Sequence, residues 1–162
     1  MDKLEIIGGK KLQGSINISG SKNASLPILA ATILANKVTL NNVPQVKDID
    51  TMTELLTSLG SKIYINKNKK KIKIHNYKSN KKVAKYKHVK TMRAGILVLG
   101  SLLSKFGKAK VSLPGGCAIG LRPVNLHIEA LKKMGVKIKI IEGYIYATAN
   151  NGLKGAKISF PK

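Results

Sequence analysis

The chain has 162 residues, 43% of them hydrophobic, which suits one ordinary domain with a hydrophobic core. Its formal charge is +23, its only cysteine rules out an internal disulfide, and no stretch reaches the roughly 18 unbroken apolar residues of a membrane span. No apolar signal segment follows Met1. We therefore expect a soluble, cytoplasmic globular protein that neither crosses nor binds a membrane.

The charge arises from 30 basic and 7 acidic residues and leaves two interpretations open. A nucleic-acid-binding module would carry such a charge, and so would a solvated lysine surface produced by biased composition. Only Arg93 and Arg122 are arginines. Nucleic-acid surfaces usually use the planar guanidinium heavily, so the composition favours the solvated surface and makes a nucleic-acid partner the alternative. The two arginines also suggest positions that need bidentate binding of carboxylate or phosphate.

In chain order, the sequence predicts one series of elements twice. The first series is a strand at 16–18, a helix at 24–35, a strand at 38–40, a helix that runs up to Gly60 and a lysine-rich hairpin at 63–74. The second series is a helix at 92–103, a strand at 111–113, a helix that begins at Pro123 and ends before Gly135, and a hairpin at 136–147.

Each series corresponds to a strand–helix–strand–helix–strand–strand unit of an α/β fold. The units are placed at about 15–86 and 88–160. Because the helices are apolar enough to need cover on more than one side, we expect the units to pack around a helical core. Repeats of this kind usually need three or more copies to bury their faces. The chain stops about where a third copy would start, so the sequence indicates a truncated repeat domain.

A glycine-rich loop after Pro114 is the most informative segment. Three glycines within six residues allow the loop unusual backbone angles. Arg122 then precedes Pro123, a favoured first helical residue, so the free amides of a helix start would face the loop and attract phosphate or carboxylate. Cys117 lies in the loop, where a nearby arginine and helix start favour a reactive thiolate. Burial as a small apolar residue is the alternative for this cysteine.

Two other helix starts carry polar and basic residues. Lys22 and Asn23 follow the candidate N-cap Ser21, and Arg93 stands at the corresponding position of the second series. Together with Arg122, these residues form the set that an anionic substrate would need, although each is also compatible with simple solvation. No His or Cys cluster has metal-ligand spacing, so we expect no metal and no cofactor.

Several motifs resemble the UDP-N-acetylglucosamine 1-carboxyvinyltransferase family. They are 20–24, 90–94, Leu113-Pro114-Gly115-Gly116-Cys117 and Arg122-Pro123-Val124. The resemblance runs through the whole chain, and the cysteine loop distinguishes it from the related family that acts on shikimate 3-phosphate. It implies the enolpyruvyl transferase fold, an inside-out α/β barrel, with two of the three units of one domain present. It also implies that residues 1–21 pack on the second domain and that 22–162 are an incomplete first domain.

The resemblance further implies an activity. The family transfers enolpyruvyl from phosphoenolpyruvate to the 3-hydroxyl of UDP-N-acetylglucosamine and releases phosphate. This is the first committed step of peptidoglycan synthesis, so the implied roles are in cell wall biogenesis, cell shape and cell division. Cys117 would be the general acid and the fosfomycin target. Phosphoenolpyruvate would be bound by Lys22, Asn23 and Arg122. The UDP-sugar would be bound by Asn23, Arg93, Arg122, Pro123, Val124, Asn125 and Leu126.

The same resemblance identifies what this chain lacks. Asn125 stands where the family usually has Asp. The family's carboxylate that deprotonates the sugar hydroxyl, and a further arginine that binds phosphoenolpyruvate, belong to the C-terminal remainder of the enzyme. We therefore expect the two substrates and that remainder as partners, and we expect the chain to be inactive alone.

Overall fold

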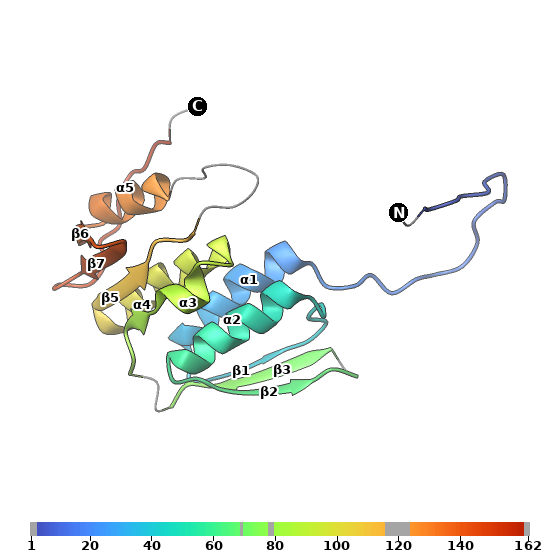
Figure 1. Ribbon diagram of the computed structural model, residues 1–162, viewed down its shortest axis with the longest axis horizontal. Coiled ribbons are helices and arrows are strands. Elements are labelled where there is room, and N and C mark those ends of the chain that lie inside the picture. The colour runs from blue at the N-terminus through green and yellow to red at the C-terminus, as the bar shows by residue number, and fades with distance from the viewer. Residues whose placement is uncertain (1–2, 69, 78–79, 116–123, 161–162) are drawn as a thin grey trace.

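The computed structural model describes residues 3–68, 70–77, 80–115 and 124–160 (Figure 1). The first repeat unit (residues 22–75) contains α1 Lys22–Ala31, the 3-10 helix η1 Thr32–Leu34, β1 Lys37–Leu40, α2 Lys47–Ser58, β2 Lys62–Asn66 and β3 Lys71–His75. The second repeat unit (residues 83–148) contains β4 Val83–Ala84, α3 Tyr86–Val89, the 3-10 helix η2 Arg93–Leu97, α4 Val98–Phe106, β5 Lys108–Ser112, α5 Asn125–Lys133, β6 Lys137–Ile141 and β7 Tyr144–Thr148.

Each unit builds one small sheet around a hairpin. In sheet 1 the order is β1-β3-β2, and all neighbours are antiparallel, with Val38 and Ile63 both opposite Ile74. In sheet 2 the order is β4-β5-β7-β6, where β5-β7-β6 repeats the antiparallel arrangement of sheet 1. The short strand β4 adds a parallel neighbour to β5. The two units therefore share a topology, and sheet 2 has one strand more.

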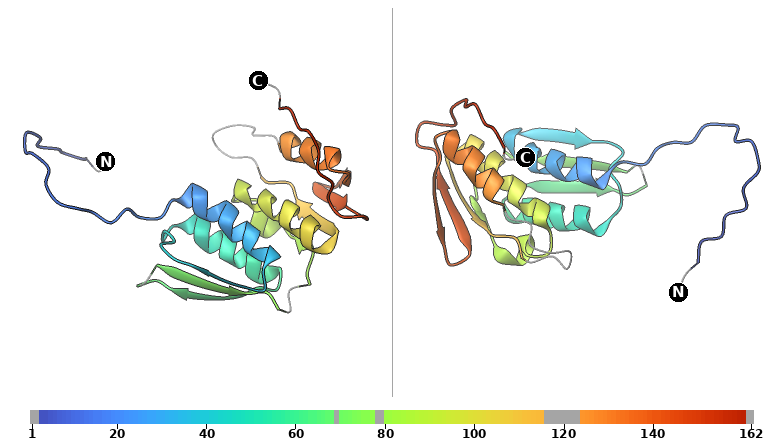
Figure 2. Two further views of the ribbon diagram at one scale, coloured as in Figure 1. Left: turned by 180° about the vertical axis from the view of Figure 1, so that it is seen from behind. Right: turned by 90° about the horizontal axis from the view of Figure 1, so that it is seen from above.

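The helices form the centre of the molecule, as the apolar helix patterns predicted. The α1 and α2 helices pack on each other over sheet 1, and α4 packs on β5 and η1 (Figures 1 and 2). Side chains alternate along the strands, so one face of each sheet contributes to this core. The largest fully buried side chains come mostly from the helices and include Leu29, Met52, Leu55, Leu56, Leu99, Leu102 and Leu103. Burial of this apolar surface is the main force that holds the two units together.

Three sequence predictions need correction. The strand expected at 16–18 does not form: residues 3–20 contain neither helix nor strand and project from the body, leaving Ile16 and Ile18 exposed (Figures 1 and 2). The described residues provide no neighbouring strand to pair with it, and an unpaired strand is unstable. The second unit begins earlier than 88, because Val83–Ala84 supplies its first strand. The helix expected at 92–103 is divided into η2 and α4.

Candidate active site

Lys22 and Asn23, both predicted to bind substrate, lie in the first turn of α1. Ser21 is the N-cap: its hydroxyl accepts a hydrogen bond from the amide of Ala24 at 3.3 Å, and its carbonyl accepts one from the amide of Ser25 at 2.9 Å. The side chains of Lys22 and Asn23 are exposed. The positive end of the helix dipole and an ammonium group therefore coincide at this helix start, an arrangement that favours anions.

The backbone leading into α1 is held by Asn42, a residue that the sequence analysis did not select. Its side-chain amide accepts from the Gly20 amide and donates to the Ile18 carbonyl, both at 3.1 Å. Gly20 approaches so closely that an added Cβ would lie 1.8 Å from the Asn42 carbonyl oxygen. Only glycine fits there, so the Gly20–Asn42 contact fixes where the first turn of α1 begins.

Lys22 makes an ion pair that ties two helix starts together. Its Nζ lies 3.0 Å from Oδ2 of Asp48, in the first turn of α2, and the two side chains are 48% and 40% exposed. Asp48 and Asp50 both lie in the first turn of α2. The pairing with Lys22 was not predicted, because it depends on α1 and α2 lying side by side. At this exposure the ion pair positions the ammonium group and adds little stability.

The other predicted residues are distributed over the second unit. Arg93 begins η2, which packs against α1, and its side chain is exposed. Val124 is buried just before α5, whereas Asn125 and Leu126 are exposed in its first turn. Gly115 lies against α3: an added Cβ would meet the Lys90 carbonyl oxygen at 2.7 Å. The beginning of the cysteine loop is thus held beside the segment that leads to Arg93. Cys117, Arg122 and Pro123 lie outside the described residues.

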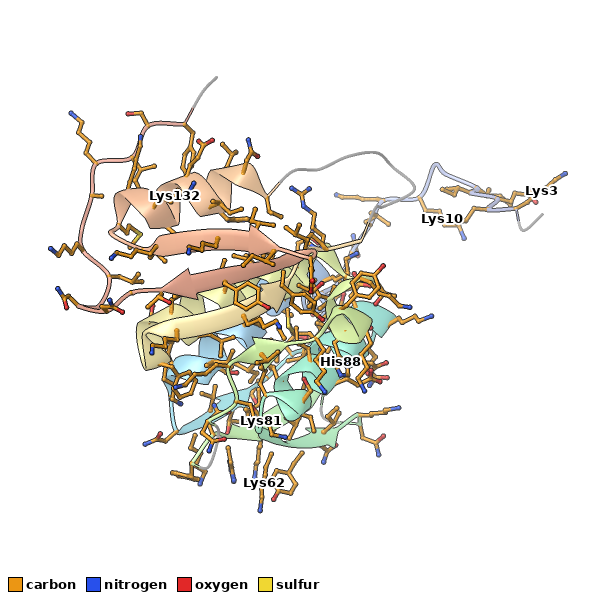
Figure 3. All side chains as sticks on the ribbon, turned by 60° about the vertical axis from the view of Figure 1, so that its left-hand side comes forward. Lys3, Lys10, Lys62, Lys81, His88 and Lys132 are labelled. Atoms are coloured by element: carbon orange, nitrogen blue, oxygen red, sulfur yellow. The ribbon has the colours of Figure 1, made fainter. Side chains whose placement is uncertain are left out.

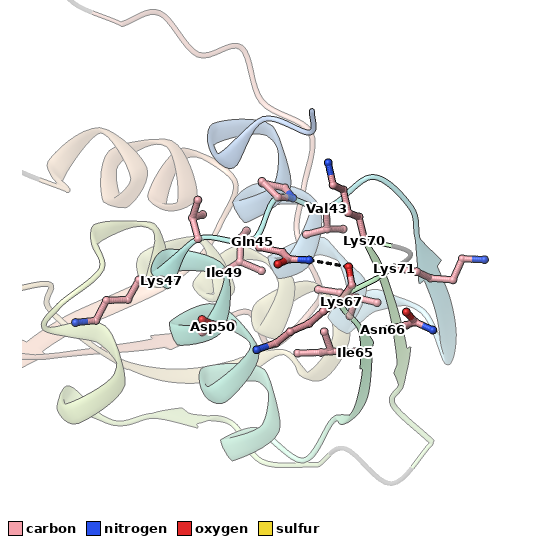
Figure 4. A pocket seen from close by; sticks show the side chains of 13 residues that line it. Val43, Gln45, Lys47, Ile49, Asp50, Ile65, Asn66, Lys67, Lys70 and Lys71 are labelled. Atoms are coloured by element: carbon pink, nitrogen blue, oxygen red, sulfur yellow. Dashed lines mark hydrogen bonds between the residues drawn. The ribbon is translucent and has the colours of Figure 1, made fainter. Parts of the chain in front are cut away.

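A hollow of about 290 Å³ lies on the other side of the α2 start, between that helix and the β2–β3 hairpin (Figure 4). Gln45 donates a hydrogen bond from Nε2 to the Lys67 carbonyl at 2.6 Å across it. Lys47, Lys70 and Lys71 belong to its rim, but their side chains point in different directions, away from the hollow. Their charges do not converge, so we assign no anion site to it.

Two further properties concern the described part of the chain. Its His, Cys, Asp and Glu residues form no group of three or more that could hold a metal ion. None of its helices has the length and apolar character that a membrane crossing requires.

Comparison with known proteins defines the family. A model of EPSP synthase (3-phosphoshikimate 1-carboxyvinyltransferase) matches residues 6–162, nearly the whole chain. The chain belongs to this family. The solved enolpyruvyl transferase NikO from Streptomyces tendae superposes with a TM-score of 0.73 at 19% identity, covering 91% of this chain and 32% of that protein. Since the identity is low, this likeness supports the EPSP synthase fold alone. The predicted enolpyruvyl transferase fold is confirmed.

Sequence relatives within the EPSP synthase family are more specific. The chain is 66% identical over 163 aligned residues to the UDP-N-acetylglucosamine 1-carboxyvinyltransferase of Pelagibacter ubique (strain HTCC1062). It is 56% identical to the protein of that name from Aliarcobacter butzleri (strain RM4018). Both alignments cover all of this chain and 39% and 38% of the relatives. The resemblance inferred from the motifs is confirmed, and the chain spans about two fifths of the length of these relatives.

Proposed function

We propose that this chain is the N-terminal portion of an enzyme that transfers enolpyruvyl from phosphoenolpyruvate to the 3-hydroxyl of UDP-N-acetylglucosamine and releases phosphate. The observation that carries the proposal is the 66% identity to a UDP-N-acetylglucosamine 1-carboxyvinyltransferase, which extends over all of the chain. The exposed helix start with Lys22, Asn23 and the Gly20 contact supports it. On this proposal, the protein acts in the cytoplasm in cell wall synthesis and is a fosfomycin target through Cys117.

The roles of the residues follow from the charges of the reaction. Lys22 and Arg122 would neutralise the phosphate and carboxylate of phosphoenolpyruvate, with Asn23 hydrogen-bonded to the substrates. Cys117 would protonate the methylene carbon as the sugar oxygen attacks, because this addition builds positive character at the enol carbon. The cations would then stabilise phosphate as it leaves. The Asp48 carboxylate, 3.0 Å from the Lys22 ammonium, holds that cation at the helix start before an anion arrives.

The UDP-sugar would contact both units. Arg93 would meet charged groups of the substrates, and the backbone from Arg122 to Leu126 would hold the nucleotide. Asn125 and Leu126 are exposed in the first turn of α5, as such contacts require, while Val124 anchors the start of this helix in the core. Asn125 would offer an amide where the family usually has Asp.

The remaining proposed partner is the C-terminal portion of the enzyme. Two features of this chain would receive it. The first is β1, which is an edge strand of sheet 1. The equivalent strand of sheet 2, β5, is not at an edge, because the parallel strand β4 pairs with it. The second is the segment 1–21, whose described residues leave Leu4, Ile6 and Leu12 exposed and suit packing on a second domain. We propose that 22–162 belong to the first domain.

Phosphate release tests the proposal. Purified chain is mixed with phosphoenolpyruvate, with and without UDP-N-acetylglucosamine, alone and together with the C-terminal portion of a 66%-identical relative. We expect release only when the sugar nucleotide and the C-terminal portion are both present. Cys117→Ser should abolish it, and Cys117→Asp, which keeps a proton donor, should retain part of it. Release that is independent of the sugar nucleotide, or unchanged in Cys117→Ser, would contradict the proposed reaction.

A further inference from the structure

The outer face of sheet 1 carries lysines and aromatic rings and is opposite to the face that packs on the helices. His75 lies opposite Lys37 on one side and Lys62 on the other, and Lys73 lies opposite Tyr64. Because residues two apart on a strand project to the same side, these five side chains share one face of the sheet. We call the set Lys37, Lys62, Tyr64, Lys71, Lys73 and His75 the basic face. Figure 3 shows Lys62 pointing away from the helices at this surface. The three strands contain no acidic residue, so nothing within sheet 1 neutralises these lysines.

Aromatic rings form a row across the basic face. The Tyr64 and His75 ring centroids are 5.5 Å apart, and those of His75 and Tyr77 are 6.0 Å apart. Tyr64 and Tyr77 are 56% and 66% exposed. Nε2 of His75 is buried yet has no hydrogen-bond partner among the described residues. Beside the row lies a hollow of about 300 Å³ lined by Tyr64, Lys71 and Lys73. The surface therefore combines exposed rings with a hollow bordered by positive charge.

Sheet 2 provides an internal comparison, because its outer face also carries lysines and tyrosines. There Nζ of Lys110 lies 4.7 Å from the ring centroids of both Tyr144 and Tyr146, so a cation of the protein itself already covers those rings. Among the described residues, no lysine lies over the ring of Tyr64 or Tyr77. The two sheets have similar residues, but only sheet 1 leaves its rings available to an external ligand.

We propose that the basic face of sheet 1 binds single-stranded nucleic acid without sequence preference, an activity separate from enolpyruvyl transfer. Single strands are bound where a positive groove follows the phosphates and bases stack on aromatic side chains. The lysines on β1, β2 and β3 flank the aromatic row on both sides and supply the first requirement, and Tyr64 and Tyr77 supply the second. The scarcity of arginine argues against base-specific readout and does not support this proposal; it is compatible with it only because lysine can hold phosphates as a point charge.

Binding of the full 162-residue chain to a fluorescein-labelled oligothymidylate, followed by fluorescence anisotropy over a series of salt concentrations, tests the charge component. In the double variant Lys62→Gln/Lys73→Gln, we expect the slope of log K against log salt to decrease by about 1.4, since each contacted phosphate of a single strand contributes about 0.7. Lys137→Gln/Lys139→Gln on sheet 2 removes the same charge and should leave the slope unchanged. Equal losses in the two variants would overturn the proposal, because total charge alone would then explain binding.

The aromatic component is tested separately. Tyr64→Leu should weaken binding to the oligonucleotide about tenfold, the loss expected for one stacked base, whereas Tyr146→Leu should not change it. Neither variant should alter binding to heparin, a polyanion that has no bases. Unchanged oligonucleotide binding in Tyr64→Leu, or an equal loss of heparin binding, would overturn the proposal.

A third measurement separates nucleic acid from a membrane surface, which also attracts lysines and tyrosines. Sedimentation with phosphatidylserine vesicles should be unaffected by Tyr64→Leu. Vesicle binding that depends on Tyr64, with oligonucleotide binding that does not, would overturn the proposal in favour of a lipid surface. Because Tyr64 is more than half exposed, its replacement should leave the fold intact. Thermal unfolding followed by circular dichroism checks each variant, and Tyr64→Phe, which keeps the ring, should restore binding.

Discussion

The two repeat units complete the same helix-to-strand junction with different chemistry. In the first unit, the side-chain amide of Asn76 donates to the carbonyls of Thr32 and Ala35 at 2.7 and 2.8 Å, at the end of η1. In the second unit, Gly107 ends α4 in a left-handed conformation with φ of 66°, and its amide donates to the Leu103 carbonyl at 2.8 Å. The carbonyl groups at the helix end are thus satisfied by a buried side chain in the first unit and by the backbone amide of a glycine in the second.

The equivalence is visible in the backbone hydrogen bonds. The amide of Asn76 donates to the carbonyl of Asn36 at 2.8 Å, and the amide of Ala149 donates to that of Gly107 at 2.7 Å. Each bond joins the residue after the last strand of the unit, β3 or β7, to the residue before the antiparallel partner of that strand, β1 or β5. Ala149 has no side-chain amide to offer, and Gly107 needs none. The two units therefore have the same topology but use different hydrogen-bond donors for the backbone carbonyls at the helix end.

The largest effect should come from Asn76→Ala. Asn76 is 2% exposed and also accepts a hydrogen bond from the Ser61 hydroxyl at 2.6 Å. The substitution leaves two carbonyls and a hydroxyl without this partner in a buried place, so we expect the free energy of unfolding to fall by about 3 kcal/mol. Urea unfolding followed by circular dichroism measures it. Ser61→Ala, which removes a single partner, should cost about 1 kcal/mol. A cost for Asn76→Ala no greater than that of Ser61→Ala would show that Asn76 does not cap η1.

A smaller loss is expected when the glycine of the second unit is replaced. Gly107→Ala forces an alanine to adopt a positive φ and places its Cβ 3.2 Å from the Ala149 carbonyl oxygen. We expect a loss of about 1–2 kcal/mol in the same urea assay. Gly100→Ala is the matched control: Gly100 lies inside α4 with open space around it, so alanine there should raise stability by up to about 1 kcal/mol. If both substitutions changed stability in the same direction, the left-handed cap would not explain the junction.

The sequence predicted where each helix-to-strand junction lies, but not which residues complete the hydrogen bonds at the helix end. Apolar spacing and the glycines at 60 and 135 located α2, α5 and both hairpins, because these signals are local. The two-residue strand Val83–Ala84 was missed, since a parallel strand this short shows no alternation and is defined only by its pairing with β5. The expected helix 92–103 begins instead as η2, where Gly95 packs so closely on Val89 that an added Cβ would lie 3.3 Å from it. That contact is tertiary and leaves no local signal.

The candidate site shows the same division between local and long-range information. The placement of Lys22 and Asn23 at a helix start follows from Gly20, Ser21 and the apolar run after them, and the structure agrees. The roles assigned to them remain predictions. The partners Asp48 and Asn42 could not be assigned from sequence, because they approach α1 only after α2 packs beside it. Residues that position a site from a neighbouring element are the ones that sequence patterns do not reveal.

The smallest predicted effect concerns the place where the two units meet. His88 in α3 borders, with Glu54 and Lys87, a hollow of about 490 Å³ between α3 and α2. Burial, followed by the charge of Lys87, lowers the pKa of His88; Glu54 acts in the opposite direction and Lys85 in the same one. The folded protein therefore binds this proton less readily than the unfolded chain, whose histidine titrates near pH 6.5. Stability should be fully present above about pH 6.5 and should decrease as pH falls through the folded pKa.

His88→Gln tests this sign. We expect the free energy of unfolding of the unaltered protein to decrease between about pH 7 and about pH 5.5, and the decrease to be shallower in the variant, which cannot gain the proton. Lys87→Gln should give an intermediate slope, because it removes the larger of the two repulsive charges and leaves the burial. Added salt should likewise reduce the contribution of the lysine, since it screens exposed charges. A slope that is the same with and without His88 would mean that the contact between α3 and α2 does not depend on this imidazole. The packing that joins the two units would then rest on the apolar helix contacts alone.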